Sequence, residues 1–260
     1  METLQPFFHK DSGAFWCGKL RAGVTGITAV CLELDDPESD FIQDRPKITV
    51  ARAGGFFVKR YNLPGFFTQL RRLFKTSRLQ TVLRGAEHLN KLGIPTPSVV
   101  AILTEYRGVR RREYLVTELF KEGEKVLNLV IHQSSDRESI RQQLLSEFLP
   151  QLAALHDSGA LHGDLNMRNL YLDKSGMIGM IDLDGMRLTG QPLKAALRAR
   201  ELARFASGFL LCCRKWDETE DFTEQVLQNY SKYAVVTPSL EETLPLTQKF
   251  IDRSRKHYEY

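Results

Sequence analysis

The residues with the clearest chemical potential lie in two short stretches, LHGDLNMRN at residues 161–169 and IDLDG at residues 181–185. Asp164 precedes Asn169 by five residues, and Asp182 follows that asparagine after thirteen more. An aspartate held in a loop can orient an attacking hydroxyl or accept its proton. Amide and carboxylate oxygens suit Mg²⁺, which takes a few ligands from protein and the rest from phosphate and water. The pattern therefore predicts a hydroxyl-activating group beside a Mg²⁺ site.

A predicted β-hairpin explains the long spacing between the asparagine and the second aspartate. The segment NLYLDKSGMIGMID (169–182) has the pattern of two short strands, with DKSG as the turn between them. Asn169 starts one strand and Asp182 ends its partner. The turn therefore brings the two side chains back to the same end of the hairpin.

The two stretches resemble the catalytic segments of protein kinases. HGDLNMRN is similar to the catalytic loop HRDxxxxN, and IDLDG occupies the position of the DFG segment, with both spacings kept. The resemblance implies that Asp164 is the base or hydroxyl-orienting residue and that Asn169 and Asp182 are the Mg²⁺ ligands. It also implies that His162 is structural and braces the loop. The alternative, a capped turn before a solvated hairpin, requires two motifs to agree by chance.

The elements that must position these residues change character near residues 119–125. The first part contains five strand-like runs, ITAVCLEL, KITVARA, GFFVKRY, SVVAIL and EYLVTELF, the last two joined by TEYRGVRRR. Helical spacing places six residues on one face of a helix that ends at Gly93: Leu79, Val82, Leu83, Ala86, Leu89 and Asn90. We expect an N-lobe at residues 1–118.

The remainder, residues 119–260, is predicted to be a mainly helical C-lobe. SSDRESIRQQLLSEFLPQLAALHDSG has the pattern of one long amphipathic helix closed by Gly159, with a kink at Pro150. Further helices are predicted over LKAALRARELARFASGFLLCC and TEDFTEQVLQNYSKYA. The kinase resemblance thus implies one α+β domain with a two-lobed kinase-like fold, whose small antiparallel-sheet N-lobe carries one key helix.

A kinase also needs groups that hold ATP. Lys59, in the alternating run GFFVKRY, sits where the family places the lysine of VAIK, although a solvated surface lysine is the ordinary alternative. Glu87 is the only carboxylate between Arg78 and Gly93, so it is the candidate partner of that lysine unless it is simply an exposed helix residue.

The resemblance is weakest at the glycine-rich loop, because no G-x-G-x-x-G precedes the candidate lysine. Gly54 and Gly55 are the nearest candidates for close approach to phosphate, and a simple tight turn explains them equally well. Glu118 and Phe120, at the lobe boundary, lie where the resemblance places the adenine-binding hinge.

Several features favour a small-molecule, sugar or glycolipid acceptor over a peptide. Gly163 replaces the Arg of HRD, and no APE motif follows IDLDG. The segments FFVKRY, EHLNKLGIPTPSV, LHDSGALHGDLNMRN and IDLDGMRL resemble the lipopolysaccharide-core kinases of the Kdo/WaaP family. That resemblance implies ATP and Mg²⁺ as cofactors and an inner-core sugar as acceptor, with a slight lean toward 3-deoxy-D-manno-octulosonic acid (Kdo) over heptose.

Three alternatives stay open at this point. They are another kinase-like small-molecule kinase, a small atypical Ser/Thr protein kinase and a non-catalytic pseudokinase scaffold. The complete set of candidate catalytic residues argues against the scaffold, and an acceptor panel separates the other two. The acceptor, the hydroxyl position and the oligomeric state are not encoded in any recognisable motif.

Composition restricts the class of partner and the compartment only broadly. The net charge is +4 over 260 residues, too small to indicate nucleic acid but compatible with an anionic glycolipid or an anionic membrane surface. Two basic clusters, RRLFKTSR (71–78) and YRGVRRREY (106–114), are either solvated faces or docking surfaces of this kind. We see no signal peptide and no membrane-spanning run, and therefore expect a cytoplasmic protein, peripheral at most on the inner membrane face.

Overall fold

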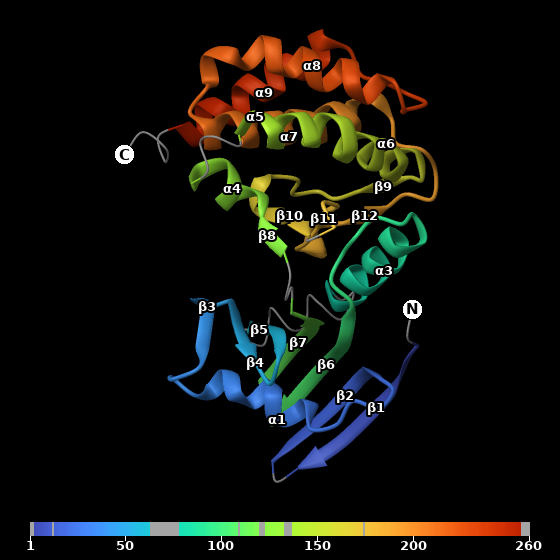
Figure 1. The fold of residues 1–260 in the computed structure, drawn as a ribbon. Helices are drawn as coiled ribbons and strands as arrows, with labels where there is room; N and C mark the ends of the chain where they lie inside the picture. The colour runs from blue at the N-terminus through green and yellow to red at the C-terminus, as the bar shows by residue number, and fades with distance from the viewer. Residues whose placement is uncertain are drawn as a thin grey trace. The chain divides into compact units, whose positions relative to one another are not determined.

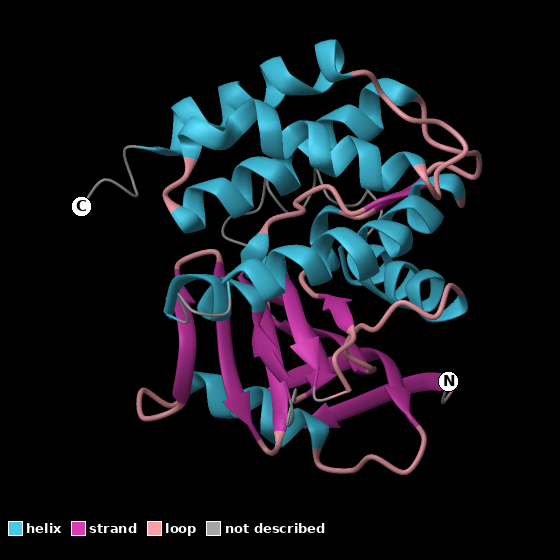
Figure 2. Cartoon of the chain, turned by 45° about the horizontal axis from the view of Figure 1, so that its top comes forward, coloured by secondary structure: helices cyan, strands magenta, loops and turns pink. Residues whose placement is uncertain are grey.

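The computed structural model describes residues 3–11, 13–62, 78–108, 110–119, 123–132, 137–173 and 175–255. Two compact units make up the chain. The first contains Met1–Ala86 and Pro97–Lys121, and the second contains Glu87–Thr96 and Glu122–Tyr260. In Figure 2 the strands of the first unit are magenta and the helices that dominate the second are cyan. The predicted α+β class, with an antiparallel sheet followed by a mainly helical part, is confirmed.

One antiparallel sheet of seven strands forms the first unit, in the order β1-β2-β6-β7-β5-β4-β3 (Figure 1). The strands are β1 (Leu4–Asp11), β2 (Ala14–Arg21), β3 (Asp40–Arg45), β4 (Ile48–Ala53), β5 (Phe56–Asn62), β6 (Val99–Arg107) and β7 (Arg110–Glu118). Predicted strands β4 and β5 are confirmed, while the hairpin β1–β2 and strand β3 were not predicted. The core of this unit is built on Trp16, Val58 and Tyr114, all fully buried.

The prediction of a strand over ITAVCLEL is wrong, because this segment is helix α1 (Ile27–Leu32) followed by the 3₁₀ turn η1 (Glu33–Asp35). The β-branched residues of the segment favoured a strand. The buried residues, however, are Ile27, Cys31 and Leu34, which are spaced four and three apart as on a helical face. Burial of that face in the core of the sheet decided the conformation.

The basic segment TEYRGVRRR is also not a connecting loop. Strands β6 and β7 continue through it, so that Tyr106 pairs with Arg111 and Arg107 with Arg110, and the chain reverses at Gly108 with φ 58°. Charged residues on both faces gave this segment the appearance of a loop. Cross-strand pairing instead satisfies its backbone and gathers its arginines on the sheet.

Helix α3 (Arg78–Lys91) follows the predicted period, and Gly93 ends it with a left-handed φ of 70°. Five of the six residues expected on its buried face are buried. The sixth, Asn90, is exposed, which corrects the prediction for that position. Leu89 before it is fully buried and Lys91 after it is exposed, so the buried face of the helix ends at Leu89.

The second unit consists of six α-helices and three short β-pairings in the part of the chain that the structure describes. Its helices are α4 (Val126–His132), α5 (Arg137–Gln143), α6 (Leu149–Asp157), α7 (Ala195–Cys213), α8 (Thr219–Ser231) and α9 (Leu240–Ser254). The single long helix predicted before Gly159 is divided, because a π-helical turn, η2 (Leu144–Phe148), separates α5 from α6. Pro150 lies at the start of α6, where its missing N–H interrupts the regular hydrogen bonding.

Small strands frame the loop that carries the candidate catalytic residues. Strand β9 (Ala160–Leu161) pairs with β12 (Arg187–Leu188), and β10 (Leu170–Asp173) lies between β8 (Gly123–Lys125) and β11 (Ile178–Met180). Helix α7 is the buried centre of the unit, with both apolar and charged residues fully covered. Among the described residues, no helix combines the length and the apolar character that a membrane crossing requires.

Candidate active site

The hairpin β10–β11 brings the two candidate metal ligands to the same end, as predicted. Leu170 pairs with Met180, and the N–H of Ile181 donates to the carbonyl of Asn169 at 2.9 Å. Asn169 therefore lies directly before β10, opposite the residue that precedes Asp182. Local antiparallel pairing sets the positions of both residues, which explains why their spacing in the sequence was enough to predict that they lie at the same end of the hairpin.

The carboxylate of Asp164 is held by two side chains. Asn169 donates from Nδ2 to the Asp164 carbonyl at 2.8 Å and to its Oδ2 at 3.3 Å. The guanidinium of Arg204, from helix α7, forms an ion pair with Oδ1 of the same carboxylate. The Asp164 side chain is nevertheless 50% exposed, so it is both oriented and accessible. This is the arrangement that a group acting on a bound hydroxyl requires.

Arg204 was not recognised from the sequence. Its guanidinium lies over the ring of Phe250 in α9, 5.2 Å from the ring centroid. A cation stacked on an aromatic ring in this way loses freedom of rotation and is stabilised electrostatically. Phe250 and Asp164 thus hold the Arg204 side chain from two directions.

His162 connects the loop that carries Asp164 to the hairpin β10–β11. Its side chain is fully buried, Nε2 lies 3.0 Å from the carbonyl oxygen of Ile181, and Nδ1 accepts the N–H of Asp164 at 3.4 Å. Because a carbonyl oxygen can only accept, Nε2 is the donor in the contact with Ile181. These contacts link the loop to the segment that carries Asp182.

Gly163 has a steric reason to be glycine that the sequence did not reveal. Its φ is +86°, and an added Cβ would lie 2.2 Å from the carbonyl oxygen of Gly185. Any larger residue would therefore meet backbone that cannot move aside like a flexible side chain. The close packing of the two loops therefore explains why no arginine stands at this position.

The backbone of this loop is anchored on Glu201, a buried residue of α7 that sequence reasoning missed. Its Oε1 accepts the N–H of Gly163 at 2.6 Å, and its Oε2 accepts the N–H of His162 at 3.0 Å. Oε2 also lies 3.0 Å from Nε2 of His156. Burial raises the pKa of the Glu201 carboxyl, but the hydrogen bond and charge of His156, the charge of His162 and the hydrogen bond from the Gly163 N–H outweigh burial and lower this pKa overall.

The anchor continues into a buried polar network across three helices. Nδ1 of His156 lies 2.8 Å from the hydroxyl of Tyr230, which also accepts from Arg198 at 2.9 Å. Arg198 in turn pairs with Asp157 at 2.6 Å. We call Asp157, His156, Arg198, Glu201 and Tyr230 the loop anchor. The available sequence signal was the presence of Arg198 and Glu201 on the apolar face of a helix, where charges need partners.

Asp182 has an unusual backbone conformation for a non-glycine residue, with φ 61° and ψ 59°. Such conformations are costly and are retained mostly at functional sites. With Nδ2 of Asn169 donating to Asp164, the amide oxygen of Asn169 remains as an acceptor. Among the described residues, no three or more His, Cys, Asp or Glu side chains form a metal-binding group. One amide and one carboxylate match the few protein ligands that Mg²⁺ needs beside phosphate.

The candidate ATP-phosphate lysine lies in the first unit. Lys59 pairs with Leu115 across β5 and β7, and its Nζ is 5.4 Å from the ring centroid of Tyr61. Arg78 at the start of α3 approaches the same ring at 5.8 Å. Glu87 belongs to the second unit and is half-buried. The pairing of Lys59 with Glu87 crosses between the units and stays a prediction.

The remaining predicted positions are distributed around the sheet. Gly54 and Gly55 form the turn between β4 and β5, both with left-handed φ, and an added Cβ on Gly54 would lie 2.5 Å from Val30. Glu118 ends β7, where its carboxylate pairs with Arg21 and its N–H donates to a backbone carbonyl. Phe120 lies outside the described residues, as does most of the first basic cluster.

Comparison with known proteins adds independent information on the family. The sequence model of the lipopolysaccharide kinase (Kdo/WaaP) family matches residues 67–233. The 3-deoxy-D-manno-octulosonic acid kinase of Vibrio vulnificus (strain YJ016) is 24% identical over 143 residues, or 54% of this chain. The match spans 57% of that relative, so the chain aligns with little more than half of its length.

Solved structures with similar chain traces include two kinases. The bifunctional kinase-methyltransferase WbdD matches 80% of this chain and 50% of its own, with 16% identity and a TM-score of 0.46. The vaccinia related kinase 3 matches 99% of this chain and 94% of its own, with 13% identity and a TM-score of 0.44.

Proposed function

The chain belongs to the lipopolysaccharide kinase (Kdo/WaaP) family, a family of phosphotransferases, and on this premise we propose that it transfers the γ-phosphoryl group of ATP to a sugar hydroxyl of the lipopolysaccharide inner core. The observation that carries the proposal is the orientation of Asp164. Its carboxylate is half exposed and is held by Asn169 and Arg204. This supports a role in aligning the acceptor hydroxyl for attack.

In the proposed mechanism each residue has a separate task. Lys59, oriented by Glu87, binds the α- and β-phosphates, with the turn at Gly54 and Gly55 as candidate phosphate contacts and the segment at Glu118 and Phe120 as the candidate adenine site. Asn169 and Asp182 are the residues proposed to hold Mg²⁺, which when bound offsets charge on the β/γ-phosphate oxygens. The chain itself then contributes mainly positioning and electrostatic stabilisation.

The loop anchor supports this assignment, because it gives the catalytic loop a rigid base. Glu201 accepts two consecutive backbone N–H groups of the loop, and His162 ties the loop to the residue before Asp182. A proton-accepting group placed on such a supported loop keeps its geometry without reorganisation during the reaction. We accordingly propose His162 as a structural residue of the site.

The acceptor, the lobes and the location are further parts of the proposal. We propose a Kdo or heptose hydroxyl as acceptor. Kdo is favoured by the residues of the motifs HGDLNMRN and IDLDG and by the similarity to the 3-deoxy-D-manno-octulosonic acid kinase of Vibrio vulnificus. We propose residues 1–118 and 119–260 as the two lobes of one kinase-like domain. We also propose that the protein works at the cytoplasmic face of the inner membrane, using ATP and Mg²⁺.

An acceptor panel with labelled ATP tests this function. The purified chain is incubated with Kdo-lipid A, a heptose-containing core oligosaccharide, an aminoglycoside and a generic peptide, and products are identified by mass spectrometry. We expect phosphate on a core sugar. Phosphate on the peptide or the aminoglycoside alone would instead support the alternative kinases, and failure to bind Mg-ATP would support a scaffold.

The role of Asp164 is tested with a matched pair of variants. Asp164→Asn removes the group proposed to act on the hydroxyl and should reduce the transfer rate by about 10²–10⁴-fold while the protein stays folded. Asp217→Asn, an exposed substitution of the same kind in η5, should keep wild-type rates. Circular dichroism checks the folding of both variants, and a wild-type rate in Asp164→Asn would remove this assignment.

A further inference from the structure

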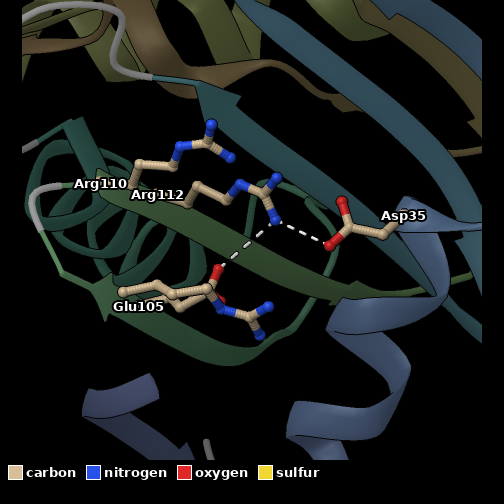
Figure 3. Close-up of a pocket in the computed structure, with 5 residues that line it drawn as sticks. Asp35, Glu105, Arg110 and Arg112 are labelled. Atoms are coloured by element: carbon tan, nitrogen blue, oxygen red, sulfur yellow. Dashed lines mark hydrogen bonds and ion pairs between the residues drawn. The ribbon is translucent and has the colours of Figure 1, made fainter. Parts of the chain in front are cut away.

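A charged cavity lies on the sheet of the first unit, remote in sequence from the candidate catalytic residues. It has a volume of about 230 Å³ and is lined by residues from η1, β6 and β7: Asp35, Glu105, Arg107, Arg110 and Arg112. We call it the arginine pocket. Figure 3 shows Arg110 and Arg112 extending side by side from β7, with Asp35 and Glu105 on either side of the Arg112 guanidinium.

The arginine pocket lies on the face of the sheet opposite the candidate ATP-phosphate lysine. Consecutive strand residues point to opposite faces. Arg60 on β5 pairs with Asp35 of the pocket, at 2.6 Å, and Lys59 precedes Arg60 directly. A ligand of the arginine pocket therefore does not compete with the phosphates that Lys59 is proposed to hold.

Positive charge exceeds negative charge around this cavity. Asp35 pairs through its two oxygens with Arg60 at 2.6 Å and with Arg112 at 2.8 Å. Glu105 has Arg107 at 3.3 Å and Arg112 at 3.7 Å. Arg110 has no ion pair within the described part of the chain. Three guanidinium groups and two carboxylates thus line the cavity, which leaves one positive charge for an anion to balance, and Arg60 adds a further positive charge beside Asp35.

The carboxylates hold the arginines in place. Glu105 is only 2% exposed, its Oε2 accepts the hydroxyl of Tyr114 at 2.9 Å, and its Oε1 has no hydrogen bond. Hydrogen bonds from Arg112 and Arg60 lower the pKa of Asp35 despite the opposing effect of its partial burial. The ion pairs of the two carboxylates orient Arg112 and Arg107, so the pocket is organised before any ligand arrives.

We propose that the arginine pocket binds a phosphate group carried by a second ligand, independent of the nucleotide. Guanidinium groups match the oxygens of phosphate in pairs of parallel hydrogen bonds. The volume is below the roughly 300–1,000 Å³ typical of sites for drug-sized ligands, which suits one phosphate with its immediate neighbours. A free phosphate compound and a phosphorylated lipid head group present the same chemistry here.

The proposal is tested by measuring the binding of inorganic phosphate to the full chain with titration calorimetry at low ionic strength. A non-hydrolysable ATP analogue and Mg²⁺ are kept saturating, so that the nucleotide site is filled. We expect Arg110→Ala to weaken phosphate binding about tenfold, because it removes charge-assisted hydrogen bonds. The control, Arg52→Ala, removes another exposed arginine of the same sheet, one that is paired with Asp40, and should leave binding unchanged.

A second arm distinguishes the source of the phosphate. Co-sedimentation is measured with phosphatidylcholine vesicles that contain or lack phosphatidic acid. Binding to phosphatidic acid that is lost in Arg110→Ala but kept in Arg52→Ala supports a lipid source, and binding of free phosphate alone supports a soluble ligand. No binding in either arm, or equal effects of the two substitutions, would overturn the proposal. Asp164→Asn should bind phosphate normally, so this result is separate from that of the proposed function.

Discussion

The loop anchor and the arginine pocket are both built from arginines and carboxylates, yet they solve opposite problems. In the loop anchor, Arg198 is fully buried and Glu201 is 3% exposed, and each has a partner of opposite or complementary charge. In the arginine pocket, Arg110 is exposed and positive charge is in excess. Burial makes an unmatched charge prohibitively costly, whereas an open cluster can keep donors available for a ligand. The loop anchor thus supports a loop, and the arginine pocket leaves hydrogen-bond donors available to a ligand.

Removing Glu201 should give the largest loss of stability. Glu201→Ala leaves His156 and two loop N–H groups without their acceptor, and breaking a buried pair of this kind costs about 3–5 kcal/mol. Denaturant unfolding measures the loss, and transferase activity should fall with it because the loop that carries Asp164 loses its support on Glu201. Glu224→Ala, on the exposed face of α8, is the control and should change stability by less than about 0.5 kcal/mol. Equal effects would mean that the loop anchor is not a structural unit.

A substitution at Gly163 separates backbone strain from steric collision. Gly163→Ala places a Cβ against the Gly185 carbonyl at a left-handed φ, and we expect a cost of about 1–3 kcal/mol with loss of transfer activity. Gly190→Ala is the matched control, because Gly190 has φ 72° and open space around its Cβ position. That control should lose only about 1 kcal/mol and keep activity. If the two variants lose the same amount of stability and of transfer activity, the contact with Gly185 contributes to neither.

The stability contributed by Glu201 should depend on pH in a defined direction. Its folded-state pKa is below the ordinary value of 4.5, so the folded protein releases this proton more readily than the unfolded chain. The contribution is therefore present above the unfolded pKa and is lost as pH falls through the lower folded value. The stability difference between wild type and Glu201→Gln should stay constant near neutrality and shrink below about pH 4.5. A stability difference that grows as the pH falls would show that folding does not lower the pKa of Glu201.

The smallest effect is expected at the arginine pocket. Asp35→Asn removes a carboxylate whose side chain is 40% exposed, so solvent screens its ion pairs with Arg60 and Arg112. We expect a stability loss of no more than about 1 kcal/mol in the same unfolding assay. A loss as large as that of Glu201→Ala would remove the distinction between the two charged clusters.

Several features of the fold could be predicted because they depend on local pattern. Strand alternation located Lys59, helical spacing located α3, and turn residues located the hairpin β10–β11. The segment around Ile27 shows the limit of this reasoning, since β-branched residues and helical spacing gave conflicting signals there. Packing of Ile27, Cys31 and Leu34 into the core settled the conflict in favour of a helix.

The sequence by itself determined how Asp164, Asn169 and Asp182 are placed along one loop and one hairpin. Their spacing was sufficient because the loop is short and the hairpin forms by local strand pairing. Only the tertiary structure revealed that Glu201, 38 residues after Gly163, accepts its N–H. Similarly, the pairing of Asp35 with Arg112 joins positions 77 residues apart. Contacts over such separations depend on how helices and strands pack, and packing brings charges together that no short motif contains.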